Sequence, residues 1–162
     1  MTMFLSILII IGLTLMPLLE LRASIPYGIL ATDLHWSLVF LIAVAANAVL
    51  GPLVYLFIDK LIHHFFHIRW FHKWYHAHVE ITQKRIHKSI EKYGEWGIAL
   101  FIGVPLPGTG SYSGALGSYL LGLSYKKFII ANLLGVIIAG IIVTIITFSG
   151  NGIFHLFIKI IA

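Results

Sequence analysis

Two charged residues, Glu20 and Arg22, directly follow a run of mostly apolar, uncharged residues from Met3 to Leu19. Inside a membrane each unpaired charge costs about 2.5 to 3.5 kcal/mol, so charges kept there are usually functional or neutralise one another. An arginine fork binds phosphate or carboxylate groups through two parallel hydrogen bonds. The pair therefore predicts that Arg22 receives an anionic head group and that Glu20 takes up and releases protons, which couples movement to them.

The prolines on either side of this pair, Pro17 and Pro26, predict a locally unwound backbone. In an extended chain, residues two apart face the same way, so Glu20 and Arg22 are expected to share one side. The alternative is a buried ion pair that only shapes the fold.

A second candidate anion site is the sequence VPLPGTGSYSG at residues 104–114. Its glycines permit positive φ angles that point successive backbone amides at one spot. Thr109 or Ser111 is placed to cap the helix that follows, and a buried helix N-terminus favours anions. The residues predicted to bind substrate are Arg22, Gly108, Thr109, Gly110 and Ser111.

The same stretch also fits a purely structural role. Small residues recur every four positions at Gly110, Gly114, Ser118 and Gly122, and such a strip lets helices approach closely. Proline ends a helix because it has no backbone donor and disfavours helix in the residue before it. The residues expected to shape the turns and their packing are Pro26, Pro105, Pro107 and Gly114.

The elements that must hold these residues are membrane helices. Hydrophobic residues make up 59% of the 162 residues and charged residues 10%, and the mean hydropathy is +0.97. A soluble domain of this size cannot bury so much apolar surface. Cysteine is absent, so neither a disulfide framework nor a thiolate metal site is expected. We expect one retained membrane domain without a signal peptide, a cofactor or a bound metal.

Two segments are long enough to cross a membrane. Trp36 to Ile58 and Phe128 to Ser149 carry no charge, and as helices they are about 34 and 33 Å long against a hydrocarbon core of about 30 Å. Ala131, Gly135 and Ala139 place small residues four apart on the second segment. Such a face is typical of close helix packing in lipid.

Two shorter apolar regions are expected to enter the membrane and return. Residues 94–104 and 111–123 give helices of only about 16 and 20 Å, and neither crosses alone. Lys and Arg mark the cytoplasmic side. Seven of the eleven lie within residues 60–92 and two more at 126–127, so the chain between these clusters must turn back. The same reasoning makes residues 3–30 a first hairpin with its tip near ELRASIP, although a full crossing also fits the charges.

The predicted fold is therefore an all-α integral membrane protein. Two re-entrant helical hairpins are each followed by a transmembrane helix, as an inverted repeat with broken helices that meet near the midplane. The predicted parts are residues 1–58 (first hairpin and helix), 59–93 (cytoplasmic segment), 94–149 (second hairpin and helix) and 150–162 (C-terminal tail).

The segment 59–93 is rich in histidine, aromatic and basic residues. His63 with His67, and His72 with His76, have the spacing of helical metal ligands, but no carboxylate or cysteine completes a convincing set. An amphipathic helix on the cytoplasmic membrane surface explains the composition better. Nucleic acid is not expected as a partner, because the positive charge adjoins membrane spans.

Several motifs resemble the small multidrug export protein family of prokaryotic membrane proteins. They are ELRASIP at 20–26, Asn47 with Pro52, KYGEWGIALF at 92–101 and PLPGTGSYSGALGSYLLGL at 105–123. The family's name implies drug efflux. Its architecture is similar to that of the DedA or VTT-domain proteins, whose re-entrant hairpins imply translocation of phospholipid or undecaprenyl phosphate.

Three classes of function fit these features. The first is a flippase or transporter in the inner membrane that moves an anionic phospho-lipid head group held between Arg22 and the PLPGTG backbone, with proton coupling at Glu20. The second is efflux of lipophilic cations, with Glu20 as the binding acid. The third is a membrane assembly factor without transport. An enzyme is not expected, and so small a chain favours a homodimer.

Overall fold

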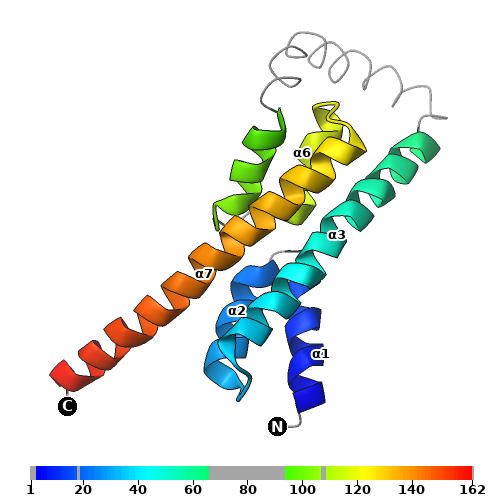
Figure 1. Ribbon diagram of the computed structural model, residues 1–162. Helices are drawn as coiled ribbons and strands as arrows, with labels where there is room; N and C mark the ends of the chain where they lie inside the picture. The colour runs from blue at the N-terminus through cyan, green and yellow to red at the C-terminus, as the bar shows by residue number, and fades with distance from the viewer. Residues whose placement is uncertain (1–2, 18, 66–93, 107–108, 162) are drawn as a thin grey trace. The chain divides into compact units, whose positions relative to one another are not determined.

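The computed structural model describes residues 3–17, 19–65, 94–106 and 109–161, with side chains as far as residue 150. These residues form six helices and no strand. In chain order the helices are α1 (Met3–Thr14), α2 (Glu20–Ala31), α3 (Trp36–Phe65), a helix over residues 94–103, α6 (Ser111–Leu120) and α7 (Tyr125–Ile161) (Figure 1). The all-helical prediction is therefore confirmed for the described part of the chain.

Two of these helices are long and apolar enough to cross a membrane, over Trp36–Ile62 and Tyr125–Gly150. Both predicted spans are confirmed, and each helix extends beyond the predicted ends. In particular, α7 continues to Ile161 without a break.

The chain divides into two compact units, and both long helices are shared between them. Unit 1 comprises Met1–Asn47 and Ile137–Ala162, and unit 2 comprises Ala48–Val136. Each unit therefore holds one pair of short helices together with part of α3 and part of α7.

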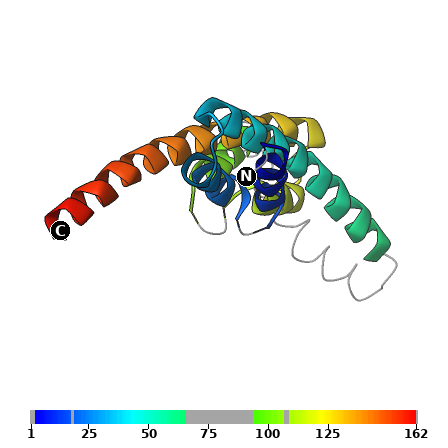
Figure 2. The same cartoon turned by 90° about the horizontal axis from the view of Figure 1, so that it is seen from below.

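In unit 1, α1 and α2 form a hairpin in which the two helices lie side by side (Figure 2). Gly28 of α2 has no room for a side chain, because an added Cβ would collide with Val39 of α3 and lie 3.1 Å from Ile10 of α1. Gly140 of α7 is similarly close to Phe40 and Val44 of α3. The apolar core of this unit includes Ile10, Leu21, Ile25, Val39 and Ala43.

The turn of this hairpin lies just before ELRASIP, at residues 15–17 and 19. The Leu19 and Glu20 amides both donate to the Met16 carbonyl, at 3.2 and 3.1 Å, and α2 begins at Glu20 with Pro26 in its interior. The predicted unwound backbone is therefore wrong. Residues two apart on a helix face different sides, so Glu20 and Arg22 do not share one side.

In unit 2, the helix over 94–103 packs against both α6 and α7. A Cβ on Gly114 of α6 would lie 2.6 Å from the Ile102 side chain, and a Cβ on Gly135 of α7 would lie 2.7 Å from the Ala99 carbonyl. Ala131, Gly135 and Ala139 are all buried, as their spacing on α7 predicted.

The C-terminus of α6 is closed by a left-handed glycine. Gly122 has φ 75°, its amide donates to the Tyr119 carbonyl, and the Leu123 amide donates to the Ser118 carbonyl. These two bonds satisfy carbonyls that the helix end leaves unpaired, a Schellman motif. Gly122 thus ends the helix and does not extend the packing strip of Gly114 and Ser118.

Candidate functional site

Glu20 is the buried carboxylate of unit 1, with 5% of its surface exposed. It begins α2, where the helix dipole favours a negative charge. Its φ of 47° lies in the left-handed region, a conformation that costs a residue other than glycine about 1 to 3 kcal/mol and that clusters at functional sites. Burial, charge and backbone strain therefore coincide at one residue.

Asn47 of α3 holds this carboxylate in place. The Asn47 side chain is 1% exposed, and its Nδ2 donates to Glu20 Oε2 at 3.2 Å. Among the described residues, no hydrogen-bond donor meets Asn47 Oδ1. The pair joins the start of α2 to α3 and presents both a negative charge and an amide oxygen inside unit 1.

The role of Asn47 was not predicted from the sequence. Asn47 was noted only as a member of a family-like motif, although it is a strongly polar residue in a span of 23 residues without a charge. A buried amide needs a partner, and this requirement was the signal that could have pointed to Glu20.

Two hydroxyls close the hairpin near this site. Thr14 Oγ1 donates to the Ile10 carbonyl at 2.8 Å and lies 2.7 Å from Ser24 Oγ. Both side chains are fully buried. These bonds hold α1 and α2 together.

Arg22 is half-buried on α2, and the Glu20 carboxylate attracts its guanidinium. Arg22 belongs to unit 1, whereas the predicted anion-binding backbone at residues 109–111 belongs to unit 2. The clamp between them therefore stays a prediction.

In the loop before α6, the Thr109 side chain bonds to the backbone of the loop itself. Thr109 Oγ1 lies 2.5 Å from the Val104 carbonyl and 2.9 Å from the Leu106 carbonyl, and it accepts the Leu106 amide at 3.2 Å. The N-cap of α6 is Gly110, with no side-chain cap and a nearly extended φ of 158°. The predicted cap by Thr109 or Ser111 is therefore wrong, whereas Gly110 has the positive φ that the sequence predicted. Pro107 and Gly108 lie outside the described residues.

A second buried asparagine, Asn132 of α7, lies against α3 within unit 2. Pro52 has no amide hydrogen, so the Ala48 carbonyl four residues earlier lacks its usual helical partner. Asn132 Nδ2 donates to this carbonyl at 3.4 Å. An added Cβ on Gly51 would lie 2.5 Å from three atoms of the Asn132 amide, so the glycine makes room for the amide. This contact is structural.

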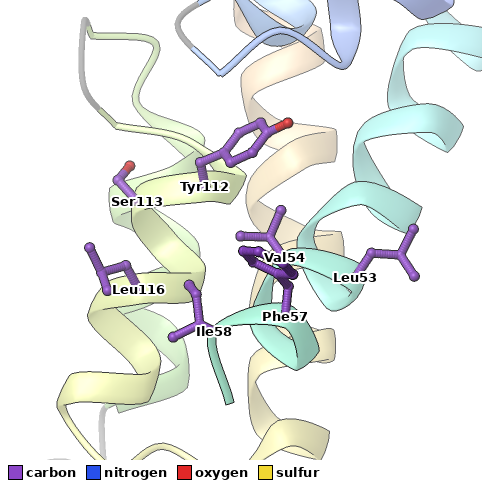
Figure 3. Close-up of a pocket in the computed structure, with 7 residues that line it drawn as sticks. All are labelled: Leu53, Val54, Phe57, Ile58, Tyr112, Ser113 and Leu116. Atoms are coloured by element: carbon purple, nitrogen blue, oxygen red, sulfur yellow. The ribbon is translucent and has the colours of Figure 1, made fainter. Parts of the chain in front are cut away.

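Unit 2 also contains an open groove of about 660 Å³ between α3 and α6. Figure 3 shows the hydroxyl-bearing side chains of Tyr112 and Ser113 at one end and apolar side chains, among them Phe57, at the other. The groove carries no charged group, unlike the interior of unit 1. Its lining residues are Leu53, Val54, Phe57, Ile58, Tyr112, Ser113 and Leu116.

Within the described residues, no three His, Cys, Asp or Glu side chains gather as metal ligands. Most of the histidine-rich segment, residues 66–93, lies outside the part that the structure describes. Neither its predicted amphipathic helix nor its alternative as a metal site is tested.

The fold and site together define a helical membrane protein with a buried carboxylate–amide pair. Residues 20–142 match the model of the family described as "Putative small multi-drug export protein", and the chain belongs to this family. The match begins at Glu20 and includes Asn47, so both members of the pair lie inside the region that defines the family. The comparisons with curated proteins and with solved structures gave no match, and none of them supports the predicted relationship to DedA proteins.

Proposed function

We propose that this protein exports lipophilic cations across the membrane, with Glu20 as the acid that binds them. The observation that carries the proposal is the burial of the Glu20 carboxylate, 5% exposed and held by Asn47. A carboxylate in a low-dielectric interior attracts a cation far more strongly than one in water. The description of the family, a small multidrug exporter, agrees with this chemistry.

The anionic-lipid function receives less support. It requires Arg22 to face the PLPGTG backbone, and this contact stays a prediction. The family's description favours an exporter of drugs over a flippase.

For the architecture, we propose that both helical hairpins enter the membrane partway, as an inverted repeat like that of the DedA proteins. Helices α1 and α2 have 12 residues each, about 18 Å, which is too short to cross about 30 Å of hydrocarbon. Each unit combines one such pair with parts of both long helices. The proposal includes an inner-membrane location with residues 59–93 in the cytoplasm.

Cysteine labelling tests this topology without background, because the chain has no cysteine of its own. Single cysteines at positions 35, 90, 108 and 125 are treated with an impermeant thiol reagent from either side. We expect 90 and 125 to react from the cytoplasm, 35 from the outside, and 108 from neither. Reaction of 90 and 125 from opposite sides would exclude the second hairpin.

The function itself is tested by the Glu20→Gln variant, which keeps the shape of the side chain and removes its charge. In cells that lack their own exporters, we expect wild-type protein to lower the accumulation of doxorubicin, a fluorescent drug with a protonated amine, and Glu20→Gln to lose this effect. Asp33→Asn, which neutralises an exposed acid of the same unit, should behave as wild type. Unchanged export by Glu20→Gln contradicts the proposal.

Arg22→Ala separates cation export from anion transport. Cation export keeps its binding acid in this variant and should persist. Translocation of a labelled anionic phospholipid, if Arg22 binds the head group, should be lost. A chain that moves neither substrate in reconstituted vesicles would instead fit an assembly factor.

A further inference from the structure

Only one of the two polar atoms of the Asn47 amide has a hydrogen-bond partner among the residues that the structure describes. Its Nδ2 donates to Glu20 Oε2 at 3.2 Å. Within the described part of unit 1, Asn47 Oδ1 is the single buried side-chain oxygen or nitrogen without a hydrogen-bond partner. The side chain is 1% exposed, so this oxygen is shielded from solvent together with the rest of the residue.

An unpaired buried acceptor is costly, and such groups are rare enough in proteins that each needs an explanation. The neighbouring hydroxyls do not provide a donor, because Thr14 and Ser24 are bonded to each other and to the Ile10 carbonyl. Asn47 Oδ1 is bonded to the same carbon as the Nδ2 that contacts Glu20, so it lies beside the carboxylate. Its missing partner is therefore a donor, and the Glu20 carboxylate beside it, which also attracts Arg22, favours a donor that carries a positive charge.

We propose that the substrates of this site are protonated amines with at least one N–H, and that quaternary ammonium compounds are bound poorly. The inference rests on the proposed function and narrows its substrate class. The positive charge of the amine is neutralised by Glu20 while its N–H donates to Asn47 Oδ1. A quaternary ammonium ion satisfies the carboxylate and leaves the amide oxygen unpaired.

The expected difference in affinity between protonated amines and quaternary ammonium ions arises because the quaternary ion leaves Asn47 Oδ1 unpaired. A site built to accept a hydrogen bond rejects an analogue that lacks the donor, since the buried polar group then keeps its full desolvation cost. A hydrogen bond to a charged group contributes more than a neutral one. We therefore expect at least a tenfold difference in Kd between matched compounds that differ only in this N–H.

The experiment uses the full-length protein in nanodiscs and two fluorescent probes. One is dimethyl(naphthylmethyl)amine, which is protonated at neutral pH, and the other is its N-methyl quaternary salt. Naphthalene fluorescence gives the Kd of each. Binding in nanodiscs avoids the difference in membrane permeability between the two compounds.

Wild-type protein should bind the protonated amine at least tenfold more tightly than the quaternary salt. In Asn47→Leu the ratio should fall to about one, because the acceptor is gone for both probes. Asn132→Leu removes another buried asparagine, in unit 2, and should keep the wild-type ratio. Should Asn47→Leu not fold, the wild-type ratio still tests the inference.

Equal Kd values in wild-type protein, or a ratio that survives Asn47→Leu, would overturn the inference and leave cation export intact. Loss of binding of both probes in wild-type protein would instead contradict the proposed function. The two failures are therefore distinguishable in one set of titrations.

Discussion

Asn47 and Asn132 show how two buried asparagines of similar exposure serve different ends. They come from the two long helices, α3 and α7, and are 1% and 0% exposed. Asn47, in unit 1, donates to the carboxylate of Glu20. Asn132, in unit 2, donates to the carbonyl of Ala48, which Pro52 leaves without its helical partner. The two buried amides thus differ in their hydrogen-bond partner, which is a carboxylate for Asn47 and a backbone carbonyl for Asn132.

The second oxygen of each amide sharpens this difference. Neither Oδ1 has a hydrogen-bond partner among the described residues. Asn132 Oδ1 lies only 2.5 Å from the position of a Cβ on Gly51, so it rests on the α3 backbone, where Cα–H groups are weak donors. Asn47 Oδ1 instead lies beside an ionisable group.

The largest expected effect separates the two residues by function. Asn47→Leu should reduce cation export in proteoliposomes about a hundredfold, because it removes a hydrogen bond to a charge and an acceptor for the substrate, together about 2.7 kcal/mol. Asn132→Leu should export at nearly the wild-type rate per folded molecule and melt at a lower temperature. Export and thermal unfolding are measured on the same preparations. A larger loss of export in Asn132→Leu would reverse the assignment.

A second prediction concerns the fit between Gly51 and Asn132. Gly51→Ala places a methyl group 2.5 Å from the amide and should lower the free energy of unfolding by about 2 kcal/mol, as overpacking does. Asn132→Ala shortens the opposing side chain, so the double variant should recover most of that loss. The measurement is unfolding in a mild detergent. If Gly51→Ala is equally destabilising with and without Asn132, the two residues do not interact.

The long helices were predictable because apolar length alone determines them. The uncharged runs from Trp36 and Phe128 fix the spans, and small residues four apart on α7 identify its packed face. These signals are local, because an apolar run or a row of small residues can be recognised within one segment. The prediction lost accuracy only at the ends, because the helices continue past the apolar run to Phe65 and Ile161.

The site was harder to predict because its parts come together only in the fold. Glu20 and Asn47 are 27 residues apart, and no local pattern joins them. Pro26 suggested an unwound backbone, yet α2 is helical there, since proline's fixed φ suits a helix and only one backbone bond is lost. Thr109 suggested a cap, yet its hydroxyl is taken by the Val104 carbonyl, near the end of the preceding helix where carbonyls lack partners.

The smallest expected effect tests why Asn132 is needed. Pro52→Ala restores an amide hydrogen for the Ala48 carbonyl, so Asn132 Nδ2 then competes with an ordinary helical bond. In a double-mutant cycle, Asn132→Ala should cost about 0.6 kcal/mol less in the Pro52→Ala background than in wild type, the usual size of an interhelical hydrogen bond in membranes. The export defect of Asn47→Leu should be the same in both backgrounds, because Glu20 needs its donor whether or not α3 contains proline. A coupling of zero for Asn132 would mean that it does not serve the carbonyl that Pro52 leaves open, and the contrast with Asn47 would lose its physical basis.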